Sequence, residues 1–242
     1  MSPAARIGMI TPSSNTCLEP TTYRILGAHP EVTVHFARVP VTRIAVDAGS
    51  DQQFRSDAMV AAARQLADAR VDVVVWNGTA GSWLGADHDH RLTAEIAAAT
   101  GVPATTSTLA MLAAFDAYDV HRLGLATPYT ADVNERIVAV YLAEGVDVLH
   151  DSALGISDNE AFARVPPSDV ATQLRAVGAG VDGVAVLCTN VYGAALAEPL
   201  EAELGVPVFD SVAITLWHAL RLAGRPLQLP GYGTVLLNRR AS

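Results

Sequence analysis

The chain has 242 residues, half of them hydrophobic and 17% charged, so it can bury the core of one large α/β domain or of two smaller halves. Its formal net charge of −9 argues against a nucleic-acid or membrane-surface partner, which would require a basic patch. The only cysteines are Cys17 and Cys188, and neither a signal segment nor a run of ~20 apolar residues is present. We therefore expect a reduced, cytoplasmic protein.

Short β-branched runs alternate along the chain with longer runs rich in alanine and leucine, a pattern typical of a parallel sheet with crossover helices. We predict strands at 7–10, 32–39, 71–76, 104–106, 123–126, 146–149, 184–187 and 208–209. We predict helices at 19–26, 53–69, 89–99, 109–118, 131–143, 168–179, 195–204 and 213–222.

Three sequence blocks recur in the same order, which indicates an internal duplication. RIGMITP at the first strand returns as RLGLATP, VDVVVWNGT returns as VDGVAVLCT, and GVP occurs twice. We expect an α/β fold of two pseudo-symmetric Rossmann-like halves, each a parallel sheet of about four strands flanked by helices. The first half is predicted to span 1–115 and the second 116–212, and the segment 213–242 is expected to complete the first half.

Polar turns follow four of the predicted strands, at 11–15, 77–82, 127–129 and 188–192. Ligands of open parallel sheets bind outside the carboxyl ends of the strands, so these turns are expected to meet in a cleft between the halves. In the register of the repeat Cys188 corresponds to Gly78. A thiol faces a bare position, which suggests proton chemistry from one side only.

Cys188 is the strongest candidate for a reactive group. It sits at a strand-to-helix turn, where backbone N–H groups and the helix dipole are expected to lower a thiol pKa. The alternative is a buried structural cysteine. Cys17 has no matching context and is interpreted as a packing residue.

Hydroxyl and amide side chains in the other turns are candidates for carboxylate binding. Thr79 lies in a glycine-rich turn that is similar to an anion-binding nest, and the phenol of Tyr129 can donate to an oxyanion. Residues 13–16 either bind an anion or cap the first helix. Trp76 and Trp83 flank the glycine-rich turn and either line a pocket or pack.

No metal site is predicted. The run 87–90 (DHDH) is interpreted as a solvated helix cap, because four successive residues at a helix start do not converge on one ion. The chain has no P-loop, no paired CxxC and no GxSxG, which argues against nucleotide, zinc and serine-hydrolase functions.

These blocks resemble the Asp/Glu racemase superfamily, and within it the branch of arylmalonate decarboxylases and maleate cis-trans isomerases. The resemblance covers essentially the whole chain and is carried by 12–16 (PSSNT), 126–136 (ATPYTADVNER), 188–190 (CTN) and 231–233 (GYG). Racemases and isomerases of this superfamily have a cysteine at both cleft positions. The glycine at 78 is similar to the decarboxylases, whereas the 12–16 loop is similar to the isomerases and Ala80 replaces a hydroxyl residue of the decarboxylase motif.

The resemblance implies a cofactor-independent decarboxylase of a substituted malonate, in which Cys188 protonates an enediolate on one face without a metal or organic cofactor. An isomerase-like or racemase-like enzyme acting on a small dicarboxylate or α-substituted acid is the alternative, and a non-catalytic carboxylate-binding homologue is the second. The expected partner is a small mono- or dicarboxylate, with a homo-oligomer left open.

The site residues that follow from the sequence and the resemblance fall into two groups. Those expected to carry chemistry are Cys188, Thr79 and Tyr129. Those expected to bind substrate are Pro12, Ser13, Ser14, Asn15, Gly78, Ala80, Thr189, Asn190 and Asn159.

Overall fold

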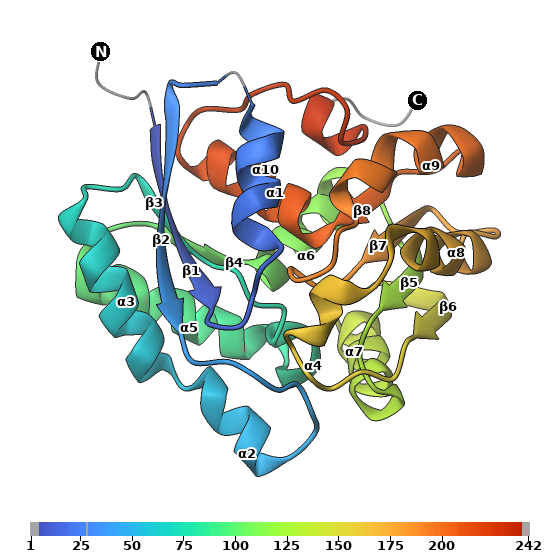
Figure 1. The fold of residues 1–242 in the computed structure, drawn as a ribbon, viewed down its shortest axis with the longest axis horizontal. Coiled ribbons are helices and arrows are strands. Elements are labelled where there is room, and N and C mark those ends of the chain that lie inside the picture. The colour runs from blue at the N-terminus through green and yellow to red at the C-terminus, as the bar shows by residue number, and fades with distance from the viewer. Residues whose placement is uncertain (1–4, 28, 239–242) are drawn as a thin grey trace.

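The computed structural model describes residues 5–27 and 29–238, which form two four-stranded parallel sheets lying side by side (Figure 1). The strand orders are β2-β1-β3-β4 and β6-β5-β7-β8, so both sheets have the same topology. The strands are β1 (Ala5–Pro12), β2 (Val32–Val39), β3 (Val73–Trp76), β4 (Ala104–Thr106), β5 (Arg122–Thr127), β6 (Asp147–Ala153), β7 (Gly183–Val186) and β8 (Val208–Asp210).

Helices cover both faces of the sheets, and within the described residues none is long and apolar enough to cross a membrane. The α-helices are α1 (Leu18–Leu26), α2 (Ala48–Asp51), α3 (Ser56–Asp68), α4 (Gly81–Leu84), α5 (Ala86–Thr100), α6 (Ser107–Ala117), α7 (Ala131–Ala143), α8 (Pro167–Val177), α9 (Ala197–Leu204) and α10 (Ser211–Leu222).

The register of the two sheets confirms the internal repeat. Ile10 of β1 pairs with Trp76 of β3, and the corresponding pair in the second sheet is Ala126 with Val186. Trp76 is therefore the counterpart of Val186, each at the end of its strand. Two residues further along the chain, Gly78 is the counterpart of Cys188.

The central strands β3 and β7 are buried along their whole length, as expected for parallel strands covered by helices on both faces. Their sequences are the continuous apolar runs VVVW and GVAV. The turns that follow β3 and β7 therefore lie at the carboxyl ends of the strands, at one edge of each sheet.

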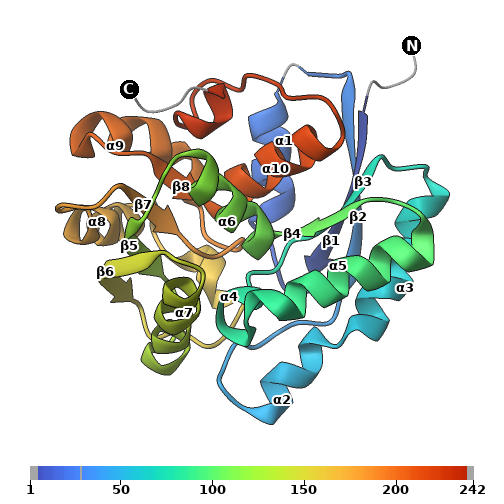
Figure 2. The same cartoon turned by 180° about the vertical axis from the view of Figure 1, so that it is seen from behind.

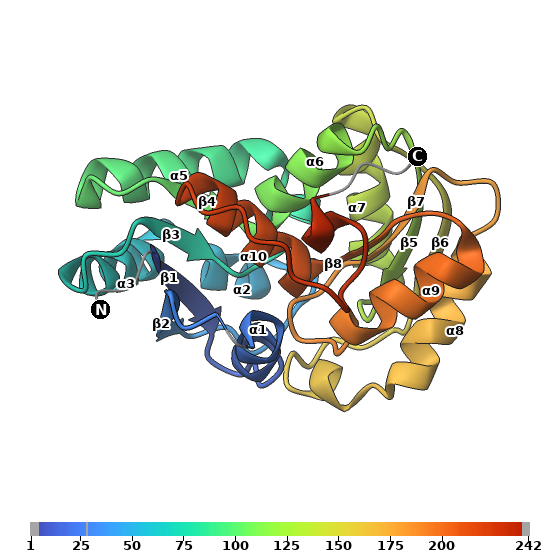
Figure 3. The same ribbon diagram turned by 90° about the horizontal axis from the view of Figure 1, so that it is seen from above.

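The helices α6 and α10 follow the equivalent strands β4 and β8 and pack against each other between the halves (Figure 3). Thr215 of α10 donates to the Ser107 hydroxyl of α6 over 2.9 Å. Phe115 of α6 packs edge-on against Phe209 of the second sheet at 5.2 Å, while α10 contacts α1, β1 and β3 of the first half. Thus α6 of the first half contacts the second sheet, and α10 of the second half contacts the first sheet. The division of the chain at residues 115 and 212 stays a prediction.

Two local details differ from the pattern-based expectations. The helix predicted over 53–69 begins only at Ser56, because Arg55 is extended and breaks the turn that precedes it. That break turns Phe54 into the interior, where 3% of it is exposed. The short helix α4 was not predicted; it lies between α5 of the first half and α7 of the second half and contacts both (Figure 2).

Candidate active site

A narrow cavity of about 20 Å³, room for about one water molecule, lies between the halves at the carboxyl ends of the central strands. All the side chains that line it are uncharged, counting the tyrosine and the cysteine as protonated: Pro12, Val41, Ile44, Phe54, Trp76, Gly78, Thr79, Trp83, Tyr129, Asn159, Cys188 and Thr189. The four predicted turns therefore contribute to one small site, built from both halves.

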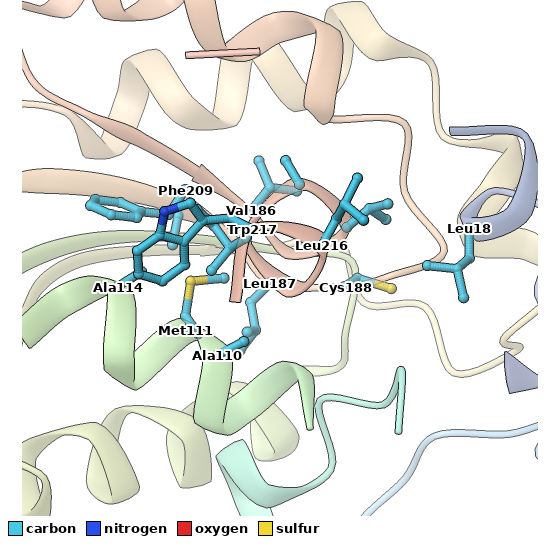
Figure 4. Close-up of a cluster of buried hydrophobic side chains, with 14 of the residues drawn as sticks. Leu18, Ala110, Met111, Ala114, Val186, Leu187, Cys188, Phe209, Leu216 and Trp217 are labelled. Carbon is cyan, nitrogen blue, oxygen red and sulfur yellow. The ribbon is translucent and has the colours of Figure 1, made fainter. Parts of the chain in front are cut away.

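Cys188 contributes a protonated thiol to this cavity. Its side chain is only 2% exposed, and the Asn190 N–H donates to its sulfur over 3.3 Å. Figure 4 shows Cys188 at the margin of the buried cluster, with its sulfur directed toward the side of Leu18.

The expected lowering of the thiol pKa is wrong. Burial raises the pKa of Cys188 to about 12, and this effect outweighs the lowering by the Asn190 N–H and by Tyr129. A thiol with this pKa holds its proton at neutral pH. It can supply a proton to a strong base, but it is a poor nucleophile.

Tyr129 and Thr79 come from opposite halves and meet at the cavity. Their hydroxyl oxygens lie 2.8 Å apart. Tyr129 is held edge-on between Trp83 at 5.5 Å and Phe162 at 5.4 Å, and burial raises the pKa of its phenol well above the usual value. The phenol therefore keeps its proton and can donate it in a hydrogen bond.

Asn15 and Thr189 connect the halves beside the cavity. The Asn15 amide donates to the Thr189 carbonyl over 3.0 Å, and its oxygen accepts from the N–H groups of Cys17 and Leu18 at the start of α1. The Thr189 hydroxyl donates to the Asn77 carbonyl over 2.9 Å. The N-cap residue of α1 is Cys17, and the Asn15 side chain satisfies N–H groups at this helix start, which is close to one of its two predicted roles.

Asn190 and Asn159 form a second connection. Asn190 accepts from the N–H groups of Thr16 and Cys17 and donates to the Asn159 carbonyl over 2.5 Å. Asn159 in turn donates to the Ser14 hydroxyl over 2.7 Å. The polar side chains at this edge of the cavity are largely occupied with each other.

The predicted site residues divide accordingly. Those that line the cavity are Cys188, Thr79, Tyr129, Pro12, Gly78, Thr189 and Asn159. Those that lie outside its lining are Ser13, Ser14, Asn15, Ala80 and Asn190. Ala80 is buried just before α4, and both serines bond to Val41. Whether any of these residues acts on a substrate stays a prediction.

The position that corresponds to Cys188 in the repeat is not bare, contrary to the expectation. A Cβ added to Gly78 would meet Cε2 of Trp76 at 2.3 Å and Nε1 at 2.4 Å, so the indole occupies the space that a side chain at 78 would take. The repeat contained the signal for this difference, because the bulky Trp76 corresponds to the much smaller Val186.

An apolar cover over the cavity was not predicted from the sequence. Val41, Ile44 and Phe54 line the cavity from the segment between β2 and α3. This segment is tied to the second half, since the Ile44 N–H donates to the Ser157 carbonyl over 2.9 Å. The sequence signal for this cover was the presence of apolar residues in an otherwise polar connection between β2 and α3.

The acidic run at 87–90 also differs in part from its interpretation. Asp89 is fully buried rather than solvated, and it accepts from the hydroxyl of Thr106, the residue that caps α6. Across 5–27 and 29–238, no group of three or more histidine, cysteine or acidic residues is placed to hold a metal ion.

Comparison with known proteins decides the family. The sequence profile described as arylmalonate decarboxylase matches residues 7–236, which is nearly the whole chain. The chain belongs to the arylmalonate decarboxylase family. The resemblance expected from the sequence motifs and the expected fold class are both confirmed.

Relatives of two activities are similar to this member of the family. Arylmalonate decarboxylase of Bordetella bronchiseptica is 35% identical over 182 residues, covering 73% of this chain and 76% of that protein. A double mutant of arylmalonate decarboxylase, solved in a liganded form, is 31% identical with a TM-score of 0.85, covering 96% of this chain and 98% of that one. A variant of maleate isomerase from Pseudomonas putida S16, solved with maleate, is 26% identical with a TM-score of 0.85, covering 96% and 97%.

Proposed function

We propose that this protein is a cofactor-independent decarboxylase of a substituted malonate. The observation that carries the proposal is the asymmetry of the cavity lining, which has the protonated thiol of Cys188 and, at the position that corresponds to it in the repeat, Gly78 covered by an indole. A racemase needs an acid or base on each face of the reacting carbon. A decarboxylase needs a single proton donor.

The lining of the cavity offers donors and an apolar surface to the two carboxylates of a malonate, and the cavity must widen to admit them. One carboxylate is held by neutral donors, which are the hydroxyls of Tyr129 and Thr79 and the N–H groups of the turns after Gly78 and Cys188. The other carboxylate faces the apolar cover, where its poor solvation raises its energy relative to the transition state.

The reaction then needs one bond cleavage and one proton transfer. The bond between the α-carbon and the carboxylate in the apolar region breaks, CO₂ leaves, and the electron pair forms an enediolate held by the preorganised donors. Cys188 gives its proton to one face of the α-carbon, and the resulting thiolate takes a proton back from water. The raised pKa of the thiol suits this role, because the donor must be protonated before the step begins.

A maleate isomerase is the second candidate. The PSSNT loop at 12–16 favours it, and so does the overall similarity to a maleate isomerase solved with maleate. In such an enzyme the amide of Asn15 would bind a second carboxylate. In this structure that amide donates to the Thr189 carbonyl, a bond that a substrate carboxylate would have to replace.

Incubation of the purified protein with phenylmalonate, methylmalonate and maleate separates these reactions. The proposal expects CO₂ release from at least one malonate, and a rate at least about 100-fold lower for Cys188→Ser, because a positioned general acid contributes about that much or more. Cys17→Ala is the matched control, since this second buried cysteine lies outside the cavity lining, and it should keep the activity. Fumarate formed from maleate without CO₂ release from any malonate would favour the isomerase, and the absence of any turnover that depends on Cys188 would refute the proposal.

A further inference from the structure

Two buried indole N–H groups at the cavity have no hydrogen-bond acceptor within the described residues. They belong to Trp76, which is 0% exposed, and Trp83, which is 4% exposed, and both side chains line the cavity. The third tryptophan, Trp217, lies in the core away from the site, and its N–H donates to Asn238 over 3.1 Å. Buried donors are almost always paired in native proteins, so two unpaired donors at one small cavity call for an explanation.

The position of the Trp76 donor is defined by Gly78. Nε1 lies 2.4 Å from the point that a Cβ of Gly78 would occupy, and Gly78 itself lines the cavity. The part of the indole that carries the N–H therefore lies over Gly78, the position that corresponds, through the repeat, to Cys188. Where a symmetric site would have a second thiol, this chain has an indole donor.

The charge of the cavity gives this donor a partner. No lysine, arginine or histidine is among the residues that line the cavity, so a bound carboxylate would meet only neutral donors. The hydroxyls of Tyr129 and Thr79 already bond to each other and can supply only part of the hydrogen bonding that two carboxylate oxygens accept. An indole N–H is a donor only, and it cannot take a proton from the substrate.

We propose that the Trp76 indole N–H donates a hydrogen bond to a carboxylate oxygen of the substrate, beside Gly78. This inference deepens the proposed function and rests on it for the reaction, but it assigns the oxygen-binding group independently of the reaction. The carboxylate lies against Trp76, and the α-carbon lies between the indole and the thiol. The Trp76 wall binds oxygen, and the Cys188 wall delivers the proton.

The test follows the indole N–H groups directly in the Cys188→Ser variant, in which turnover is expected to be at least about 100-fold slower. With three tryptophans in the chain, a ¹⁵N-labelled protein gives three indole N–H resonances, assigned by changing each tryptophan to phenylalanine. The probes are phenylmalonate, methylmalonate, maleate and phenylacetate. The Trp76 resonance is expected to shift on titration while that of Trp217 stays in place.

The affinity provides the second readout. Trp76→Phe keeps an aromatic ring but removes the N–H, and it should raise the Kd of the bound probe about 10- to 100-fold, the usual effect of losing a hydrogen bond to a charged group. Trp217→Phe is the matched control and should leave the Kd within about twofold, because Trp217 lies outside the cavity lining.

The outcomes separate this inference from the proposed function. If malonates release CO₂ but the Trp76 resonance does not move and Trp76→Phe binds normally, the indole assignment is overturned and the decarboxylase stands. If the resonance shifts but no malonate releases CO₂, the indole assignment stands and the decarboxylase fails. If none of the four carboxylates binds, the indole assignment is overturned as well.

Discussion

Positions 78 and 188 correspond in the repeat, and the side chain two residues before each one determines whether that position has room for a side chain. In the second half the small Val186 leaves room for the Cys188 side chain, whereas in the first half the indole of Trp76 crosses the space above Gly78. Glycine at 78 is therefore required by packing in this chain. The asymmetry of the cavity depends on the pair Trp76 and Gly78 together.

A double-mutant cycle tests this dependence. Gly78→Cys alone places atoms within 2.3 Å of the indole, and it should lower the free energy of unfolding by about 1–3 kcal/mol, the usual effect of overpacking. Trp76→Val alone should lower it by about 3–5 kcal/mol by leaving a cavity. The double variant, which copies the Val186–Cys188 arrangement, should lose at least about 1 kcal/mol less than the sum.

Urea unfolding of the parent, both single variants and the double variant measures the coupling. Gly183→Ala is a useful comparison, because its Cβ would also meet a buried ring, that of Phe209 at 2.7 Å, but far from Trp76 in the chain. Its effect should simply add to that of Trp76→Val. If the changes in the free energy of unfolding of Gly78→Cys and Trp76→Val simply add, the indole of Trp76 does not restrict the side chain at position 78.

At the scale of elements, the hydrophobic pattern predicted the buried strands, but it did not predict where a helix begins or which way a side chain points. The strands β3 and β7 were recognisable because a strand buried on both faces is a continuous apolar run. The break at Arg55 and the inward turn of Phe54 were not, since they depend on contacts distant in sequence, such as that of Phe54 with Trp83. Likewise, the sequence placed Cys188 at a turn but could not show that burial dominates its pKa.

The cap of α10 has a pH dependence of its own. Oδ1 of Asp210 accepts from the N–H groups of Val212 and Ala213 at 3.0 Å, while Oδ2 has no partner within the described residues. Asp210 is 0% exposed, and burial raises its pKa to about 7. Because the folded pKa lies above the unfolded value of about 3.9, the folded state binds this proton more tightly. Stability is therefore lost as the pH rises from about 4 to about 7.

Asp210→Asn should remove this loss, because asparagine keeps an oxygen for the cap but does not titrate. The free energy of unfolding of the variant relative to the parent should increase between pH 5 and pH 8, by up to a few kcal/mol. Urea unfolding at pH 5, 6, 7 and 8 measures the difference. The buried His218, whose pKa is lowered to about 4, changes stability in the opposite direction below pH 6.5, but it is present in both proteins and cancels. Parallel pH profiles would contradict a raised pKa for Asp210.

At the scale of the whole molecule, the cavity exists because the two halves are held closed around it. The repeat predicted two similar halves and a cleft, since both follow from the order of the blocks. It also led to the expectation that the segment 213–242 completes the first half, but it could not predict the asparagine contacts, because these join positions that the repeat leaves unrelated. The lining residues come from both halves, so any loosening of the closure should disturb the site.

Asn190 is the side chain whose loss should loosen this closure most. Asn190→Ala leaves the Thr16 N–H and the Asn159 carbonyl without their partners, and takes one of two acceptors from the Cys17 N–H. An unsatisfied buried polar group costs about 1–3 kcal/mol, so the variant should lose about 2–5 kcal/mol in urea unfolding. Tyr192→Phe is the matched control, because its hydroxyl also reaches Thr16 across the halves, by an exposed bond of 3.3 Å, and its loss should cost less than about 0.5 kcal/mol. Equal effects of the two substitutions would mean that water replaces the buried bonds, and that Asn190 does not hold the halves closed.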